Sequence, residues 1–306
     1  MTLFAPISEG RDDCKAGEAP ARSRASLSRV NTTAASAPSD APLASTRIGE
    51  GSRRVAFLHG LMGRGRNFTG PAKELGDDFT VELIDLPDHG ASPWTDRVDY
   101  REIADRVAAH LRAGLAADGP VHLLGHSMGG KVAMVLALRH PDLVDRLIVE
   151  DISPRVSPQA TDEFVHLLGT MLRMDLDAYD SRAEADAAMA EHVHDARVRG
   201  FLLQNLRRTG GHFAWQPNVA MLFEHLREIG SFPDPVVPED PERVFDHPVL
   251  WLAGAESDYV QDEDVPRMKE LFPRVVRVTV RDAGHWLHAD QPEAFVSAVR
   301  TFLTAD

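Results

Sequence analysis

The chain has 306 residues, of which 43% are hydrophobic and 26% charged, which is ordinary for a folded protein with a sizeable core. Its formal net charge of −14 argues against a nucleic-acid partner and against docking on anionic lipid, because both depend on Lys and Arg. The single cysteine, Cys14, excludes an internal disulfide and a thiolate metal cluster. With no secretory signal pattern and no apolar stretch near the ~18 residues that span a bilayer, a cytoplasmic protein is expected.

Residues 1–41 differ in composition from the rest of the chain. The stretch Ala16–Pro42 is rich in Ala, Ser, Pro and Arg and shows no apolar periodicity, which predicts a disordered, solvated tail. An amphipathic leader rich in Arg and Ser is the functional alternative. Acidic residues near the start of the chain count against it, and the tail is interpreted as non-catalytic.

From about Pro42 the chain alternates between short apolar segments and amphipathic ones. The apolar segments predict strands at Leu43–Ile48, Arg54–Leu58, Phe79–Asp85, Val121–Gly125, Leu147–Asp151, Val249–Ala253 and Val275–Val280. Helical spacing predicts helices over residues 67–76, 100–117, 128–140, 263–272 and 292–303. This alternation predicts an α/β fold with a mostly parallel, doubly wound sheet.

Residues 157–245 interrupt the alternation. Apolar residues recur there at helical spacing in Thr161–Arg173, Arg182–His192, Ala196–Arg208 and Asn218–Ile229, and no strand is expected. A Pro-rich segment then leads back to the sheet. We therefore expect a core built from residues 42–156 and 246–306, with an all-helical cap inserted between the late strands.

The strongest chemical signal is the segment Gly125-His126-Ser127-Met128-Gly129, which follows a predicted strand and opens a predicted helix. A G-x-S-x-G sequence in that context is typical of a nucleophile elbow, a strained turn that exposes a serine hydroxyl. The amino terminus of the helix adds partial positive charge where an oxyanion would develop. Ser127 is therefore the candidate nucleophile, in preference to a structural Gly-Ser turn.

Two further segments complete the pattern. His59-Gly60-Leu61-Met62-Gly63 follows the second predicted strand, where such folds supply a backbone N–H to the oxyanion hole, so Leu61 and Met128 are the expected donors. Its glycine spacing does not match a nucleotide-binding loop. His285 follows the last predicted strand, where the base of a triad in the order Ser, acid, His would stand.

Beyond these motifs, several longer segments carry a family resemblance. The segments are Arg66-Asn67-Phe68, Asp85-Leu86-Pro87-Asp88-His89-Gly90-Ala91-Ser92, Glu150-Asp151-Ile152-Ser153-Pro154, Phe213-Ala214-Trp215 and Ala283-Gly284-His285-Trp286-Leu287-His288-Ala289-Asp290. From about residue 42 to its end, the chain resembles the α/β-hydrolase fold serine esterases grouped with abhydrolase-domain-containing protein eleven and its bacterial esterase relatives. The segment Glu150-Asp151-Ile152-Ser153-Pro154 and the last segment are less widely shared than the elbow. The resemblance implies cleavage of carboxylic esters or thioesters with no cofactor and no metal.

Two aspartates compete for the third position of the triad. Asp258 follows the strand that ends at Ala253, and Asp151 ends the strand before it. Either strand end can present a carboxylate to Nδ1–H of His285, which needs an acceptor that fixes its orientation. The resemblance favours Asp151, because esterases with a similar Asp-Ile-Ser-Pro segment use its aspartate. Asp258 stays open as the alternative acid.

The expected function is hydrolysis of a small-molecule ester with a short or medium acyl group, through an acyl-enzyme on Ser127. Trp286, beside the base, and Trp215, in the cap, are the candidate substrate-binding residues. Ser127 argues against dehalogenases and epoxide hydrolases, which carry an aspartate at the elbow. A lyase that uses the same triad, and a ligand-binding receptor without turnover, remain as alternatives.

Overall fold

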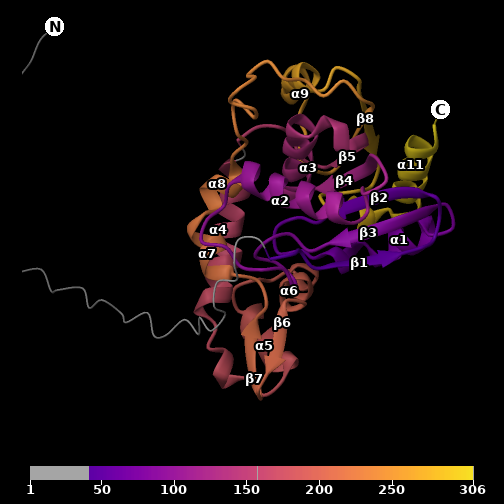
Figure 1. Ribbon diagram of the computed structural model, residues 1–306. Coiled ribbons are helices and arrows are strands. Elements are labelled where there is room, and N and C mark those ends of the chain that lie inside the picture. The colour runs from indigo at the N-terminus through magenta and orange to yellow at the C-terminus, as the bar shows by residue number, and fades with distance from the viewer. Residues whose placement is uncertain (1–40, 157, 306) are drawn as a thin grey trace, which may run out of the picture. The chain divides into compact units, whose positions relative to one another are not determined.

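A seven-stranded sheet forms the centre of the computed structural model, which describes residues 41–156 and 158–305 (Figure 1). The strand order is β1-β3-β2-β4-β5-β8-β9; β1 is antiparallel to β3 and the other neighbours are parallel. The strands are β1 (Ser45–Ile48), β2 (Arg53–Leu58), β3 (Phe79–Ile84), β4 (Val121–His126), β5 (Val144–Glu150), β8 (Val249–Gly254) and β9 (Val275–Val280). The predicted mostly parallel sheet is confirmed. Apart from Ala41, the predicted tail lies outside the described residues.

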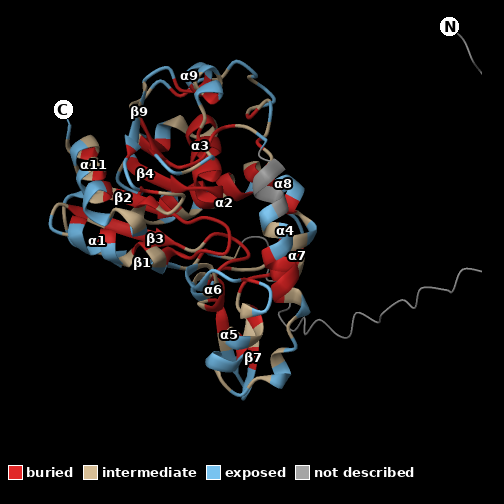
Figure 2. Ribbon diagram, turned by 180° about the vertical axis from the view of Figure 1, so that it is seen from behind, coloured by how far each residue is buried: buried red, intermediate tan, exposed pale blue. Residues whose placement is uncertain are grey.

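Helices cover both faces of this sheet because strand side chains alternate between two hydrophobic clusters. In β2, Ala56 and Leu58 join one cluster, whereas Val55 and Phe57 join the other. The first cluster is packed by α2 (Tyr100–Ala113), α3 (Met128–Arg139) and α9 (Val265–Leu271), and the second by α1 (Thr69–Leu75) and α11 (Pro292–Thr304). Figure 2 shows the buried residues gathered along the strands and on the helix sides that face them.

Short elements complete the core. They are η1 (Gly65–Phe68), η2 (Pro141–Leu143), η4 (Asp262–Asp264) and α10 (Leu287–Asp290). Among the described helices, none is long and apolar enough to cross a bilayer.

The insertion between β5 and β8 contains helices and a hairpin. Its elements are α4 (Pro158–Arg173), η3 (Leu176–Ala178), α5 (Arg182–Ala190), α6 (Ala196–Leu203), β6 (Leu206–Thr209), β7 (His212–Trp215), α7 (Val219–Glu224) and α8 (Leu226–Gly230). The prediction of an all-helical cap is therefore wrong: the helix expected to reach Arg208 ends at Leu203, and β6 pairs with β7. The reason is the pair Gly210-Gly211, whose φ angles of +61° and +94° make a two-residue turn that favours a hairpin.

Apolar packing and several hydrogen bonds attach the insertion to the core. Leu168, Met171, Leu202 and Leu222 join the same hydrophobic cluster as α2 and α3. Arg64 Nη2 donates to the Gln204 carbonyl (2.9 Å), Asn205 Nδ2 to the Met62 carbonyl (2.7 Å), and Tyr100 Oη to the Ile229 carbonyl (2.7 Å). These bonds hold α6 and α8 over the carboxyl edge of the sheet, where the candidate site lies.

Candidate active site

Ser127 stands in the sharp turn between β4 and α3. Its φ of +52° and ψ of −119° are costly for a residue with a side chain, and such strain is typical of functional positions. Glycine is required on either side, because a Cβ at Gly125 would collide with the Gly129 backbone, and one at Gly129 would lie 2.5 Å from the Leu58 and His59 carbonyl oxygens. The turn therefore presents the Ser127 hydroxyl at the amino terminus of α3.

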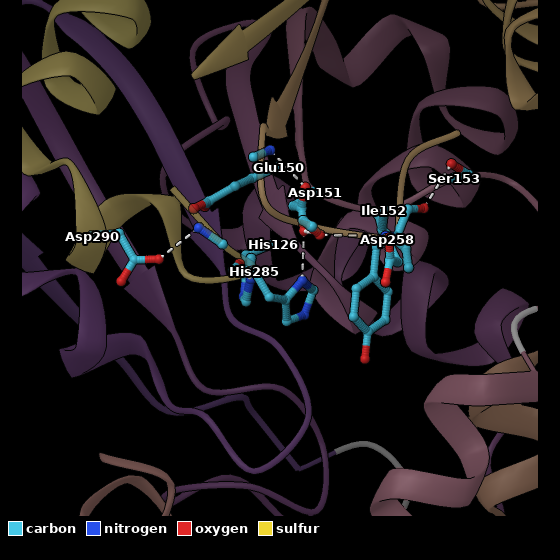
Figure 3. A network of polar contacts seen from close by, with 12 residues as sticks. His126, Glu150, Asp151, Ile152, Ser153, Asp258, His285 and Asp290 are labelled. Carbon is cyan, nitrogen blue, oxygen red and sulfur yellow. Dashed lines mark hydrogen bonds and ion pairs between the residues drawn. The ribbon is translucent and has the colours of Figure 1, made fainter. Parts of the chain in front are cut away.

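His285 is held by a buried carboxylate. Its Nδ1 lies 2.7 Å from Oδ2 of Asp151, which is 0% exposed (Figure 3). The Gly254 N–H donates to Oδ1 of Asp151 (2.9 Å), and the Ser257 hydroxyl donates to Oδ2. A carboxylate fixed by these donors cannot rotate freely, so it sets the orientation of the imidazole and leaves Nε2 as the ring nitrogen that can exchange a proton with a hydroxyl.

Asp258, the alternative acid, lies elsewhere. It is exposed, and its carboxylate has no hydrogen bond or ion pair within residues 41–156 and 158–305. Only its backbone carbonyl is used, as an acceptor for Arg155 and Gln261. Of the two candidates, the structure thus brings Asp151 to His285 (Figure 3). The neighbour of Asp258, Ser257, donates to Asp151, and sequence patterns did not reveal this contact.

Two backbone N–H groups, one in the loop after β2 and one at the elbow, are free to donate a hydrogen bond. Met62 N donates to His89 Nε2 (3.1 Å) and Gly63 N to the Gly60 carbonyl (2.9 Å). By contrast, the N–H groups of Leu61 and Met128 have no hydrogen-bond acceptor in the described part of the chain, although both residues are buried. Buried N–H groups are rarely left unpaired. These two are therefore available to hold an oxyanion next to Ser127.

Two buried histidines support that loop, a role that the sequence patterns did not predict. His59 accepts a hydrogen bond from Leu86 N at Nε2 (2.9 Å), and its ring lies 5.1 Å from that of His89. Burial lowers the pKa of His59 to about 3 and also lowers that of His89. Both rings are therefore neutral at pH 7, and each offers a lone pair that fixes a backbone N–H.

A second carboxylate–histidine pair lies beside the first. Glu150, also 0% exposed, accepts from His288 Nδ1 (2.8 Å) and from the His288 N–H (3.2 Å). Between the two pairs lies His126, whose Nε2 donates to the His285 carbonyl (2.8 Å) and whose ring is 4.6 Å from that of His285 and 5.1 Å from that of His288. Burial and the neighbouring histidines lower the pKa of His126 well below its usual value, so this ring is neutral.

His126, Glu150 and His288 are residue types that bind metals, and their ligand atoms lie within 4.8 Å of one another. In this structure His126 Nε2 bonds to backbone and His288 Nδ1 to Glu150 Oε1, whereas Glu150 Oε2 is buried with no partner among the described residues. The bonds that are made tie the cluster to the loop that carries His285.

A narrow chamber of about 30 Å³ adjoins Ser127. Its walls come from the elbow, the loop after β2, α4, α8 and Tyr259, and the lining residues are Leu61, Ser127, Met128, Lys131, Ile152, Phe164, Leu226, Ile229, Gly230 and Tyr259. The ring of Tyr259 stacks on His285 with 4.0 Å between the ring centres. The chamber is mostly apolar, which suits an acyl chain.

Lys131 is a buried charged residue that lines this chamber. Its Nζ donates to the carbonyls of Ser231 (2.7 Å), Gly230 (2.8 Å) and Ile229 (3.4 Å), and so ties the end of α8 to α3. Burial lowers the pKa of Lys131 to about 7. The sequence offered no signal for this role beyond a basic residue one helical turn after the nucleophile.

The two tryptophans predicted to bind substrate differ in position. Trp286 lines a second, larger cavity next to the loop after β2. Trp215 Nε1 donates to the Met171 carbonyl (3.1 Å), and its ring packs against the hydrophobic cluster. Trp215 lines neither of the two cavities described here, so its position is that of a packing residue.

Comparison with known proteins agrees with this geometry. Residues 55–298 match the model of the alpha/beta hydrolase family. The chain belongs to that family. Relatives include the sn-1-specific diacylglycerol lipase ABHD11 of Mus musculus (37% identity, 81% of this chain and 80% of the relative) and the esterase YbfF of Escherichia coli (29% identity, 81% and 92%).

Among solved structures, the chain is similar to a marine microorganism esterase, with a TM-score of 0.80 and 33% identity over 85% of this chain and 99% of that one. The predicted family resemblance is thereby confirmed. The prediction of a carboxylic ester hydrolase is likewise confirmed.

Proposed function

We propose that this enzyme cleaves esters of small to medium acyl groups through a Ser127–His285–Asp151 triad and an acyl-enzyme. The observation that carries the proposal is the 2.7 Å contact between His285 Nδ1 and the fully buried Asp151 carboxylate. With Nδ1–H held by Asp151, Nε2 of His285 carries the lone pair that accepts the hydroxyl proton of Ser127. The strained elbow supports Ser127 as the nucleophile.

In the first half of the reaction, Ser127 Oγ attacks the acyl carbonyl and its proton moves to His285. The carbonyl oxygen becomes an oxyanion, which accepts hydrogen bonds from the N–H groups of Leu61 and Met128. The loss of one such donor typically costs ~10²–10³ in rate. The C–O bond to the alcohol then breaks, and the alcohol leaves with the proton from His285. Asp151 stabilises the imidazolium that exists between these steps.

In the second half, His285 removes a proton from water, which attacks the acyl-enzyme carbonyl. The oxyanion forms at the same two N–H groups, and collapse releases the acid and returns the proton to Ser127 Oγ. His285 gives back each proton that it gains, so the two half-reactions need only the chain's own residues, the ester and water.

The narrow, mostly apolar chamber supports a short to medium acyl group. Its volume of about 30 Å³ is small, and it is lined by Lys131 and the end of α8, which are bonded to each other. A thioester with the same acyl group fits the same chemistry, because the thiol leaves with the proton from His285. The ABHD11 relatives are named diacylglycerol lipases, so glycerides belong in the substrate panel.

The test compares hydrolysis of p-nitrophenyl esters of two to twelve carbons by the wild type and by Ser127→Ala. We expect turnover to favour the shorter chains, and the loss of Ser127 to abolish it together with covalent labelling by a fluorophosphonate. A wild type that is neither labelled nor active would overturn the proposal in favour of a binding protein. Labelling without ester or thioester turnover would point instead to a lyase on the same triad.

A further inference from the structure

The imidazole of His285 contacts two other rings, and the two contacts differ in geometry. The ring of Tyr259 lies nearly parallel to it, with 4.0 Å between the ring centres and an angle of 19° between the planes. The ring of His126 is tilted by 44°, with 4.6 Å between the centres. A nearly parallel aromatic ring presents its π face, which carries partial negative charge. Tyr259 therefore covers the imidazole with an electron-rich surface.

The backbone at Tyr259 is fixed by the residues that hold the base. The Ser257 hydroxyl donates to Oδ2 of Asp151, and the Tyr259 N–H donates to Oγ of Ser257 (3.3 Å). On the other side of the residue, the Ser153 hydroxyl lies 3.0 Å from the Tyr259 carbonyl oxygen. The segment after β8 thus serves the base twice, because Ser257 fixes the carboxylate that holds His285 and Tyr259 places a ring against its imidazole.

His285 alternates between a neutral and a charged form in the proposed reaction, so the groups in contact with its ring affect the balance between the two. Asp151, directly after β5, is the carboxylate in contact with it (Figure 3). His126, at the end of β4, is neutral because burial and the neighbouring histidines lower its pKa. Burial raises the pKa of Tyr259, so its hydroxyl stays protonated and its ring uncharged.

Other titratable groups on the surrounding elements lie further from the imidazole. They are the Glu150–His288 pair, the Asp290–Arg197 pair, His59 in the loop after β2, Glu163 on α4 and Lys131 on α3. None of them makes an ion pair or a ring contact with His285 in the described part of the chain. Beyond the Asp151 carboxylate, the parallel face of Tyr259 is the contact that favours a cation at this position.

The physical basis is the attraction between a cation and the face of an aromatic ring. This attraction acts when the cation lies within about 6 Å of the ring centre, and the 4.0 Å between Tyr259 and His285 is well inside that limit. The resting base is neutral, whereas the imidazolium exists only after Ser127 has been deprotonated. The ring therefore interacts more strongly with the intermediate than with the resting enzyme, which is the condition for an effect on rate.

We propose that Tyr259 is a positioning residue whose ring orients the His285 imidazole and stabilises the imidazolium formed during the reaction. The inference rests on the proposed triad, in which His285 is the base. The ring face is the part of the side chain that acts, so the hydroxyl is dispensable. Tyr259 also lines the narrow chamber, and the experiment has to separate these two contacts.

The experiment measures kcat/KM for p-nitrophenyl butyrate against pH in the wild type and two variants. The midpoint of its acid limb reports the pKa of the base in the free enzyme. Tyr259→Leu keeps apolar cover over the imidazole but removes the π face, so the protonated form loses a favourable contact. We expect the midpoint to fall by about half a unit to one unit, and kcat to fall by about three- to tenfold. Tyr259→Phe keeps the ring and leaves the midpoint unchanged.

Two further measurements isolate the π face from the shape of the chamber. Phe164→Leu, the matched control, removes an aromatic ring from another wall of the same chamber and alters the acyl-chain profile with the midpoint unchanged. Phenylalanine with an increasing number of ring fluorines, introduced at position 259, keeps the shape of the ring and weakens the negative charge of its face. We expect the midpoint to fall along this series, which provides the test if Tyr259→Leu does not fold.

The alternatives give different results. Exposure of the imidazole to water raises its pKa, so a higher midpoint in Tyr259→Leu would mean that the ring only excludes water, and an unchanged midpoint would mean that it only packs. Either result overturns the proposal, as does an equal fall in Tyr259→Phe or in Phe164→Leu. If p-nitrophenol release survives Ser127→Ala, the triad itself fails. Loss of activity in Ser127→Ala without a shift in Tyr259→Leu removes only the role of Tyr259.

Discussion

Two neighbouring carboxylates at the end of β5 make nearly the same contact with different outcomes. Asp151 lies 2.7 Å from Nδ1 of His285, and Glu150 lies 2.8 Å from Nδ1 of His288. Both carboxylates are 0% exposed and both histidines belong to one short segment. Because consecutive strand residues point in opposite directions, the two carboxylates hold two different histidines, of which His288 lines the larger cavity.

This comparison teaches that a buried carboxylate–histidine pair is not by itself evidence of catalysis. The two histidines differ in their surroundings. The His285 ring contacts those of Tyr259 and His126, whereas the His288 ring packs against Phe68, 4.4 Å between ring centres. Under the proposed triad only His285 exchanges a proton with Ser127, so changes in the two carboxylates should differ in the size of their effect on activity.

The largest effect is expected for Asp151→Asn. The amide can no longer hold the Nδ1–H tautomer of His285, so kcat for a p-nitrophenyl ester falls by about 10⁴ with KM little changed. Steady-state kinetics on the purified variant measures this. A loss smaller than tenfold would remove Asp151 from the proposed triad.

A smaller effect is expected from the second pair. Glu150→Leu removes the acceptor that fixes His288 and the following turn, and a displacement of the His285 loop by ~1 Å costs about 10² in kcat. Glu150→Gln keeps an acceptor oxygen and retains activity within about tenfold of the wild type. Rescue by Gln but not by Leu identifies Glu150 as a positioning residue, while equal losses in both would contradict it.

Lys131 predicts a pH effect on stability. Its pKa is lowered from 10.5 to about 7 in the folded protein, so between these values the unfolded chain binds the extra proton. The free energy of unfolding therefore rises with pH from about 7 to about 10. This gain in stability is absent below pH 7, where the folded and unfolded chains both carry the proton. Lys131→Met removes the titrating group, so the difference in urea midpoint between the variant and the wild type should change between about pH 7 and about pH 10. A difference that is constant with pH would contradict this origin.

The smallest effect is expected for Asp258→Asn. Its carboxylate is exposed and makes no bond in the described part of the chain, so kcat/KM should stay within about twofold of the wild type. The same kinetic assay as for Asp151→Asn provides the comparison. A loss equal to that of Asp151→Asn would mean that the acid lies in the loop after β8.

The sequence determined those features whose signals are local. The β4–Ser127–α3 turn needs glycines at fixed positions around a strained serine, and the strands carry their own apolar pattern, so both were predictable along with the place of His285. The hairpin at β6 and β7 had a local signal as well, since Gly210-Gly211 favours a tight turn, but the helical spacing of residues 196–208 masked it.

Only the tertiary structure decided which groups meet. β5 and β8 are adjacent parallel strands that end at the same edge of the sheet, so the sequence alone could not tell whether Asp151 or Asp258 turns toward His285. The bond between Glu150 and His288 and the bonds from Lys131 to the end of α8 join residues 98 or more positions apart. The walls of the larger cavity come from separate elements. Such contacts depend on packing between distant segments, for which the pattern along the chain carries no direct signal.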